Sequence, residues 1–337
     1  MKKNMYDWLE EVKAAKEKKA MPILSFPSTQ LLGISVKELI NSSENQAKGM
    51  EAVALKTPKA LASVSLMDLS VEAECFGSTI VVSEHEVPTV KGAIVTSYEE
   101  AEELEVPKVG TCRTGIYIEA IEKATKLITD RPVFAGIIGS FSLAGRLVDV
   151  TEALINCYTE PDMMKVVLDK CTDFLIEYAK AFKQAGANGV VIAEPLTGLL
   201  SPDLAFEFST PYIKRLVDAV QDENFLVIYH NCGDTAIKII DSILAVGAKA
   251  YHFGNTIDMA EMMTHIPSNI VAMGNVNAAK QFRNGTVESI KNETLEIMGK
   301  CASYPNFVIS SSCDIPPLSK WENITAFFDA VDEFYKQ

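Results

Sequence analysis

Residues 225–235 read FLVIYHNCGDT, an apolar run that ends in His230, Asn231 and Cys232. The run is rich in β-branched and aromatic residues, so it predicts a buried strand. Gly233 follows directly and indicates a turn. A buried strand with polar side chains at its carboxyl end is typical of the parallel sheets of α/β proteins.

Seven further runs of this kind occur in the chain, and helical stretches follow nearly every one from the third onward. The eight predicted strands are 21–26, 62–70, 132–138, 189–194, 225–231, 248–253, 269–274 and 306–312. Eight strands with helices between them predict a (β/α)8 TIM barrel. The length of 337 residues also allows two domains. No linker or internal repeat divides the chain, so we expect a single barrel domain spanning 1–337.

Two segments fall outside the repeating pattern. The first twenty residues, MKKNMYDWLEEVKAAKEKKA, are charged and predict an N-terminal helical extension. Residues 77–107 predict an insertion that contains a hairpin, because TIVVSEHEVPTV alternates as a hairpin does and an acidic stretch follows it.

The charge balance excludes one class of function. Lys and Arg number 31 against 45 Asp and Glu, a net charge of −14, so a basic nucleic-acid groove is excluded. The chain shows neither a signal peptide nor an apolar stretch of membrane-spanning length, so we expect a cytoplasmic protein with no membrane partner. Its seven cysteines, an odd number, predict free thiols in a reducing compartment.

Three soft metal ligands stand at the ends of predicted strands. His230 and Cys232 are two residues apart, so both side chains leave one face of their strand. Cys313 ends the last strand, within NFVISSSCDIPP at 306–317, and the carboxyl ends of barrel strands form one rim. A His/Cys/Cys set suits Zn²⁺ with an open fourth position. On spacing alone, buried structural residues explain the set equally well, and the shared rim favours the metal.

Four more residues are candidates on the same rim. Glu194 and His252 each end a predicted strand, and we predict catalytic roles for both, with a packed, hydrogen-bonded histidine as the alternative for His252. Glu72 and Glu74 follow the second strand, and function or a solvated loop charge explains them equally well.

The remaining cysteines and histidines predict no chemistry. Five cysteines fall in apolar or helical settings and are expected in the core: Cys75, Cys112, Cys157, Cys171 and Cys301. His85 and His265 are expected at the surface. Neither a dinucleotide fingerprint nor a GxxxxGK[ST] loop occurs, so nicotinamide and nucleoside triphosphates are not implied.

Six stretches resemble the uroporphyrinogen decarboxylase superfamily, and within it the cobamide-dependent methyltransferases typified by methylcobamide:coenzyme M methyltransferase. They are SVEAECFGSTI (70–80), PVFAGIIGSFSLAGRL (132–147), VIAEPLTGLLSPDLAFEFSTPYIKRL (191–216), YHNCGDT (229–235), MGNVN (273–277) and SSSCDIPP (310–317). The resemblance covers almost the whole chain, and it implies that His230, Cys232 and Cys313 are zinc ligands.

The resemblance also implies a reaction, in which a methyl group moves between a corrinoid and a small substrate. A substrate thiol bound to the zinc loses its proton and attacks the methyl group of methylcobamide. Relatives run the opposite direction, so a corrinoid-dependent demethylase of a methoxylated or methylamine-type donor is an alternative. The chain has no D-x-H-x-x-G cobalamin signature, so we expect the corrinoid on a partner protein that docks over the rim, with residues 196–200 among the contacts.

Two other functions are alternatives for a chain of this kind. A metal-free uroporphyrinogen decarboxylase would carry an arginine motif after its first strand, whereas SFPSTQLLGISVKEL at 25–39 has no arginine. A non-catalytic barrel that only binds a ligand predicts neither zinc nor turnover, and three ligands at strand ends argue against it.

Overall fold

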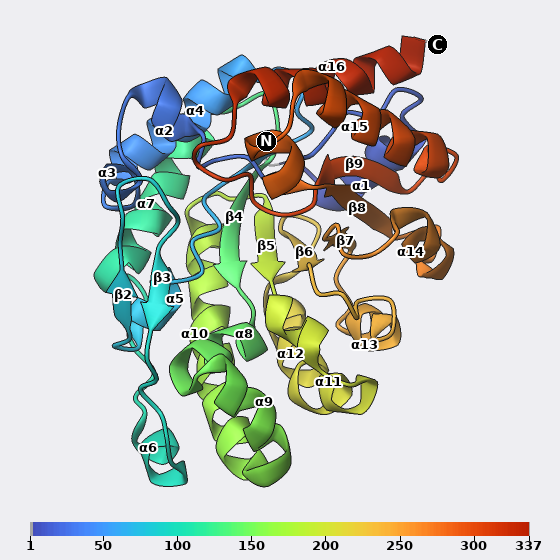
Figure 1. Ribbon diagram of the computed structural model, residues 1–337. Helices are drawn as coiled ribbons and strands as arrows, with labels where there is room; N and C mark the ends of the chain where they lie inside the picture. The colour runs from blue at the N-terminus through green and yellow to red at the C-terminus, as the bar shows by residue number, and fades with distance from the viewer. Residues whose placement is uncertain (1–2, 337) are drawn as a thin grey trace.

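A computed structural model describes residues 3–336 (Figure 1). Seven parallel strands form one sheet, in which each strand pairs with the next in the order β1-β4-β5-β6-β7-β8-β9. They are β1 (Ser63–Val64), β4 (Val133–Ile138), β5 (Gly189–Ala193), β6 (Leu226–Asn231), β7 (Ala250–Phe253), β8 (Val271–Val276) and β9 (Phe307–Ser311). All seven overlap predicted runs, and the TIM-barrel prediction is confirmed.

The eighth predicted strand, 21–26, joins the two edges of this sheet without forming a strand of its own. The N–H of Met21 donates to the carbonyl of Ile309 in β9 at 3.1 Å. The N–H of Leu61, just before β1, donates to the carbonyl of Ala20 at 2.8 Å. Residues 20–23, which we call the seam, therefore lie between β9 and β1 and close the barrel.

Two residues explain why the seam is not a regular strand. Pro22 has no N–H and leaves a gap in any ladder. The N–H of Ile23 donates to the side-chain oxygen of Ser311, at 3.0 Å, rather than to a backbone carbonyl. The prediction of a strand here is corrected to an irregular closing segment.

Helices connect the strands. Before β1 the chain forms α1 (Met5–Ala14), α2 (Ser28–Leu32), α3 (Val36–Ile40) and α4 (Ser43–Lys56). Between β1 and β4 lie α5 (Val71–Cys75), β2 (Thr79–Val81), β3 (Thr89–Lys91), α6 (Tyr98–Glu103) and α7 (Cys112–Leu127). Between β4 and β5 lie α8 (Ser140–Val148), α9 (Val150–Thr159) and α10 (Pro161–Gln184). The later elements are the 3-10 helix η1 (Pro195–Leu199), α11 (Pro202–Phe208), α12 (Thr210–Val220), α13 (Ile240–Ala245), α14 (Met259–His265), the π-helix η2 (Ala278–Arg283), α15 (Val287–Cys301) and α16 (Trp321–Lys336). The antiparallel pair β2 and β3 confirms the predicted hairpin insertion.

Apolar side chains of the strands alternate between two clusters. Along β5, Val191 and Ala193 belong to the cluster that fills the barrel interior. Val190 and Ile192 belong to the cluster between the strands and the helices. This alternation decides which strand-end residues face the interior and which face the helices.

The N-terminal helix α1 covers the amino end of the barrel. Trp8 packs against Phe134 of β4 with ring centroids 5.8 Å apart. The N–H of Met5 donates to the carbonyl of Glu223, which precedes β6, at 2.6 Å. The carboxyl ends of the strands are therefore the open side, where barrel enzymes bind their substrates. In the part of the chain that the structure describes, no helix is long and apolar enough to cross a membrane.

Candidate metal centre

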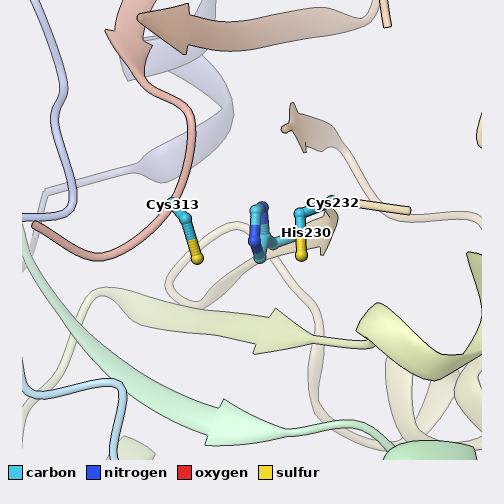
Figure 2. Close-up of side chains that lie close together, drawn as sticks. All are labelled: His230, Cys232 and Cys313. Atoms are coloured by element: carbon cyan, nitrogen blue, oxygen red, sulfur yellow. The ribbon is translucent and has the colours of Figure 1, made fainter. Parts of the chain in front are cut away.

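The structure brings His230, Cys232 and Cys313 together at the carboxyl ends of β6 and β9 (Figure 2). The atoms that could hold a metal lie within 4.8 Å of one another. His230 follows Leu226 and Ile228 at two-residue intervals, and both of these side chains lie in the interior cluster. The imidazole therefore enters the barrel lumen, and the two thiols meet it there.

The chemistry of the three donors fits a zinc ion. His230 is 2% exposed, and its Nε2 has no hydrogen-bond partner among residues 3–336. A hydrogen bond between the thiols lowers the pKa of Cys232 and raises the pKa of Cys313 to about 12. One imidazole nitrogen and two sulfurs around a common point match the protein ligands of catalytic zinc sites.

The predicted residue His252 lies directly behind His230. The two histidines are register partners in β6 and β7, and their Nδ1 atoms are 2.8 Å apart. On its far side, Nε2 of His252 lies 2.7 Å from the hydroxyl of Ser310 in β9. Both side chains are buried. Burial holds the pKa of His252 well below its usual range, and the neighbouring His230 lowers it further.

The other predicted catalytic residue, Glu194, faces the helices. It follows Ala193, which points into the lumen, so its own side chain points outward. Its carboxylate accepts the N–H groups of Phe141 at 3.0 Å and Ser142 at 2.6 Å, and also the Ser142 hydroxyl. Burial raises its pKa to about 7, although these hydrogen bonds lower it. The structure thus places Glu194 at the start of α8 and not beside the three candidate metal ligands.

Glu72 and Glu74 of α5 differ in their surroundings. Glu72 is buried, and one carboxylate oxygen accepts the N–H of Ile138 at 3.0 Å. Its other oxygen has no partner in the described chain, and burial raises its pKa to about 7. Glu74 forms an ion pair with Arg113 at 2.6 Å. Neither residue is the solvated loop charge that was one of the two alternatives.

Comparison with known proteins agrees with the fold. Residues 19–334 match the model of the family described as uroporphyrinogen decarboxylase (URO-D). The chain belongs to the uroporphyrinogen decarboxylase family.

Proteins with different named activities are similar to the chain. A methylcobamide:CoM methyltransferase, MtbA of Methanosarcina mazei, is 27% identical over 273 residues, 79% of this chain and 78% of that protein. A uroporphyrinogen decarboxylase of Coxiella burnetii is 26% identical over 265 residues, 74% of this chain and 72% of that protein.

A solved structure extends the likeness to the fold. The structure of a methyltransferase from Methanosarcina mazei superposes with a TM-score of 0.86 at 24% identity, and the match covers 99% of this chain and 98% of that one. The resemblance to the methyltransferase branch is confirmed, as is the prediction of an enzyme of the methyltransferase class.

A buried ion network on the rim escaped the sequence analysis. The guanidinium of Arg113 in α7 contacts Asp68 at 2.5 Å and Ser70 at 2.8 Å. The hydroxyl of Tyr117 donates to the same Asp68 carboxylate at 2.8 Å. Asp68 and Arg113 are 45 residues apart, and no local pattern joins them. The network holds the segment after β1 against α7.

The predictions for the other cysteines are mostly confirmed. All seven thiols, which lie within the described range, are free. Cys157, Cys171 and Cys301 are buried as expected. The prediction is wrong for Cys112, which is exposed at the start of α7, and Cys75 is only half-buried. Helical periodicity does not distinguish an exposed first turn from a buried one. His85 and His265 are exposed, as expected.

The apolar loop predicted to meet a carrier protein is only partly exposed. Residues 196–200 form η1 and the position after it. Leu199 is 52% exposed, whereas Leu200 is 3% exposed and belongs to the core. Leu199 is therefore the residue through which this loop can contact a partner.

Proposed function

We propose that the chain is a zinc-dependent methyltransferase that moves a methyl group between a corrinoid carrier protein and a small substrate thiol. The observation that carries this proposal is the buried, unpartnered Nε2 of His230 beside two thiols at the open end of the barrel. The named activity of the methylcobamide:CoM methyltransferases supports the reaction. The reducing cytoplasm is the proposed compartment, because seven free thiols suit it.

Each residue of the site has a separate role in the proposed reaction. His230 would offer a neutral nitrogen and the two cysteines would offer thiolates, so the ligand set balances the charge of the metal. A zinc ion held by these three side chains would supply Lewis-acid chemistry that lowers the pKa of a substrate thiol. Below the set, Ile228 and Met273 fill the lumen and exclude water. Substrate and carrier therefore approach from the rim.

We propose that Glu194 positions α8 and does not touch the substrate. Its carboxylate is occupied by two backbone N–H groups and a hydroxyl, which leaves it no geometry for proton transfer in the lumen. Its catalytic role in the sequence interpretation becomes one of helix capping.

Metal analysis combined with demethylation of methylcobalamin tests the proposed function. We expect about one zinc per chain, and we expect a panel of small thiols to be methylated at a rate that tracks metal content. Loss of the rate on chelation and its return with zinc would support the proposal. A protein that keeps full zinc after the double substitution Cys232→Ala, Cys313→Ala would contradict the ligand assignment.

The same experiment separates the alternatives. A decarboxylase would act on uroporphyrinogen irrespective of chelation, and the similarity to the Coxiella burnetii protein is the observation that keeps this second candidate. A demethylase of methoxylated or methylamine-type compounds would transfer the methyl group to free reduced corrinoid and leave the thiol panel unchanged.

A further inference from the structure

The imidazole of His230 has two nitrogens, and only a nitrogen without a hydrogen can bind a metal ion. Which nitrogen carries the hydrogen is decided by what surrounds the ring. The groups that surround it come from β7, β9 and the seam, so the arrangement is a property of the fold.

The far end of the arrangement is the hydroxyl of Ser310. This hydroxyl donates its hydrogen to the carbonyl of Met21 in the seam at 2.7 Å. A hydroxyl has one hydrogen, so toward His252 Ser310 has only a lone pair to offer. The Nε2 of His252, 2.7 Å away, must therefore carry a hydrogen and donate it.

A neutral imidazole with a hydrogen on Nε2 has a bare Nδ1. The Nδ1 of His252 therefore accepts, and the Nδ1 of His230, 2.8 Å away, donates. The hydrogen on Nδ1 of His230 leaves its Nε2 with a lone pair.

A second contact gives the same result from the other end. The Nδ1 of His230 also lies 3.3 Å from the backbone carbonyl of His252. A carbonyl can only accept, so this contact too requires a hydrogen on Nδ1. In the reverse arrangement, a hydrogen on Nε2 of His230 would be a buried donor with no partner among the described residues.

We infer that the chain Ser310–His252–His230 fixes His230 as the neutral tautomer that presents the Nε2 lone pair to the metal. The inference rests on the proposed function, because the lone pair acts as a ligand only if the site binds a metal ion. His252 is then a positioning residue, which acts through His230 and does not touch the substrate. Ser310 is the residue that sets the direction of all three hydrogen bonds.

Nitrogen NMR of the histidine rings tests the tautomer directly. The full chain has four histidines, and single substitutions of the two exposed ones assign their signals. In chelator-treated protein we expect His230 with its hydrogen on Nδ1 and His252 with its hydrogen on Nε2. The opposite pattern at either ring would overturn the inference. The result does not depend on metal binding, so a failure of the proposed function is distinguishable from a failure of this inference.

Two substitutions of equal size test whether His252 prepares the metal site. His252→Asn keeps a side-chain acceptor near Nδ1 of His230, and His252→Leu has nearly the same shape without a side-chain acceptor. We expect the Leu variant to bind Zn²⁺ at least tenfold more weakly than the Asn variant, because loss of a partner behind a ligand histidine typically costs about 10–100-fold in affinity. Equal affinities for the two variants, with matching far-ultraviolet circular dichroism, would contradict the role.

Ser310 is tested against a matched serine. Ser310→Ala removes the acceptor for His252, and Ser310→Thr restores a hydroxyl. Ser65→Ala is the control, because Ser65 is also buried and its oxygen accepts the N–H of Gly136 at 2.9 Å. We expect weaker Zn²⁺ binding in Ser310→Ala, recovery in Ser310→Thr and no change in Ser65→Ala. If the Ser310→Ala and Ser65→Ala variants bind equally well, Ser310 has no such role.

Discussion

Cys313 comes from a different strand end from the other two ligand residues, so its sulfur completes the proposed metal centre across the lumen. Replacement by serine leaves a harder oxygen that zinc binds less well. We expect Cys313→Ser to weaken zinc binding by more than about 100-fold, beyond the range seen for residues behind the ligands. Equilibrium titration of the chelator-treated protein with Zn²⁺ measures this.

The control for this change is Cys112→Ser, which alters a cysteine exposed on α7. It should bind zinc as the parent does. Parent-like affinity in Cys313→Ser would remove Cys313 from the ligand set.

Glu72 makes stability depend on pH. Burial raises its pKa to about 7 from the ordinary 4.5, so the folded state holds the proton more tightly than the unfolded state. The free energy of unfolding therefore falls as pH rises from about 4.5 to about 7. Glu72→Gln imitates the protonated carboxyl and keeps an acceptor for the N–H of Ile138. At pH 8 we expect the variant to be more stable than the parent by up to about 3 kcal/mol.

Urea unfolding of both proteins at several pH values checks this difference. The two curves should converge near pH 4, where the Glu72 carboxyl is protonated in both states. A constant offset between parent and variant over the whole range would show that folding leaves the pKa of Glu72 unchanged.

At the scale of elements, η1 is the part of the rim whose exposure is best defined. Leu199 is half-exposed, so Leu199→Asp should change the free energy of unfolding by no more than about 0.5 kcal/mol. We expect it to slow turnover with a methylated corrinoid protein several-fold and to leave turnover with free methylcobalamin unchanged, because only the protein carrier meets the loop.

Leu55→Asp is a suitable control, since Leu55 is exposed on α4, which precedes β1. It should not affect either reaction. If Leu199→Asp reacts with the carrier protein as fast as the parent, η1 is not part of the docking surface.

Elements also show what the sequence could predict. The strand ends could be found because apolar runs stop sharply at His230 and before Cys313, and parallel topology brings such ends to one rim. The hydrogen-bond partners of Glu194 could not be predicted, because the N–H groups that its carboxylate accepts lie at the start of α8, with Ser142 52 residues away. The orientation of a residue just past a strand end depends on the following loop, which periodicity does not describe.

At the scale of the whole molecule, one cluster of buried side chains reaches from Ala20 to Val331. We therefore expect the proposed single domain to unfold in one cooperative transition. Trp8 in α1 and Trp321 in α16 report on opposite ends of the chain, and they are its two tryptophans. Each of the variants Trp8→Phe and Trp321→Phe keeps one tryptophan. In each variant, the unfolding midpoint measured by fluorescence should coincide with the midpoint measured by circular dichroism. A fluorescence transition separate from the circular dichroism transition in either variant would show that the chain unfolds as two domains.

The seam couples barrel closure to the proposed metal centre. The N–H of Met21 donates to the carbonyl of Ile309, and the carbonyl of Met21 accepts the hydroxyl of Ser310. Ser310 is linked to His230 through His252. Local opening of the seam would release that hydroxyl and with it the ring orientation of His230. Metal binding must then oppose opening, since a ligand stabilises the state that binds it. Amide hydrogen exchange at Met21 and Ile23 should accordingly slow when zinc is added, because the barrel opens least at the seam when the metal is bound.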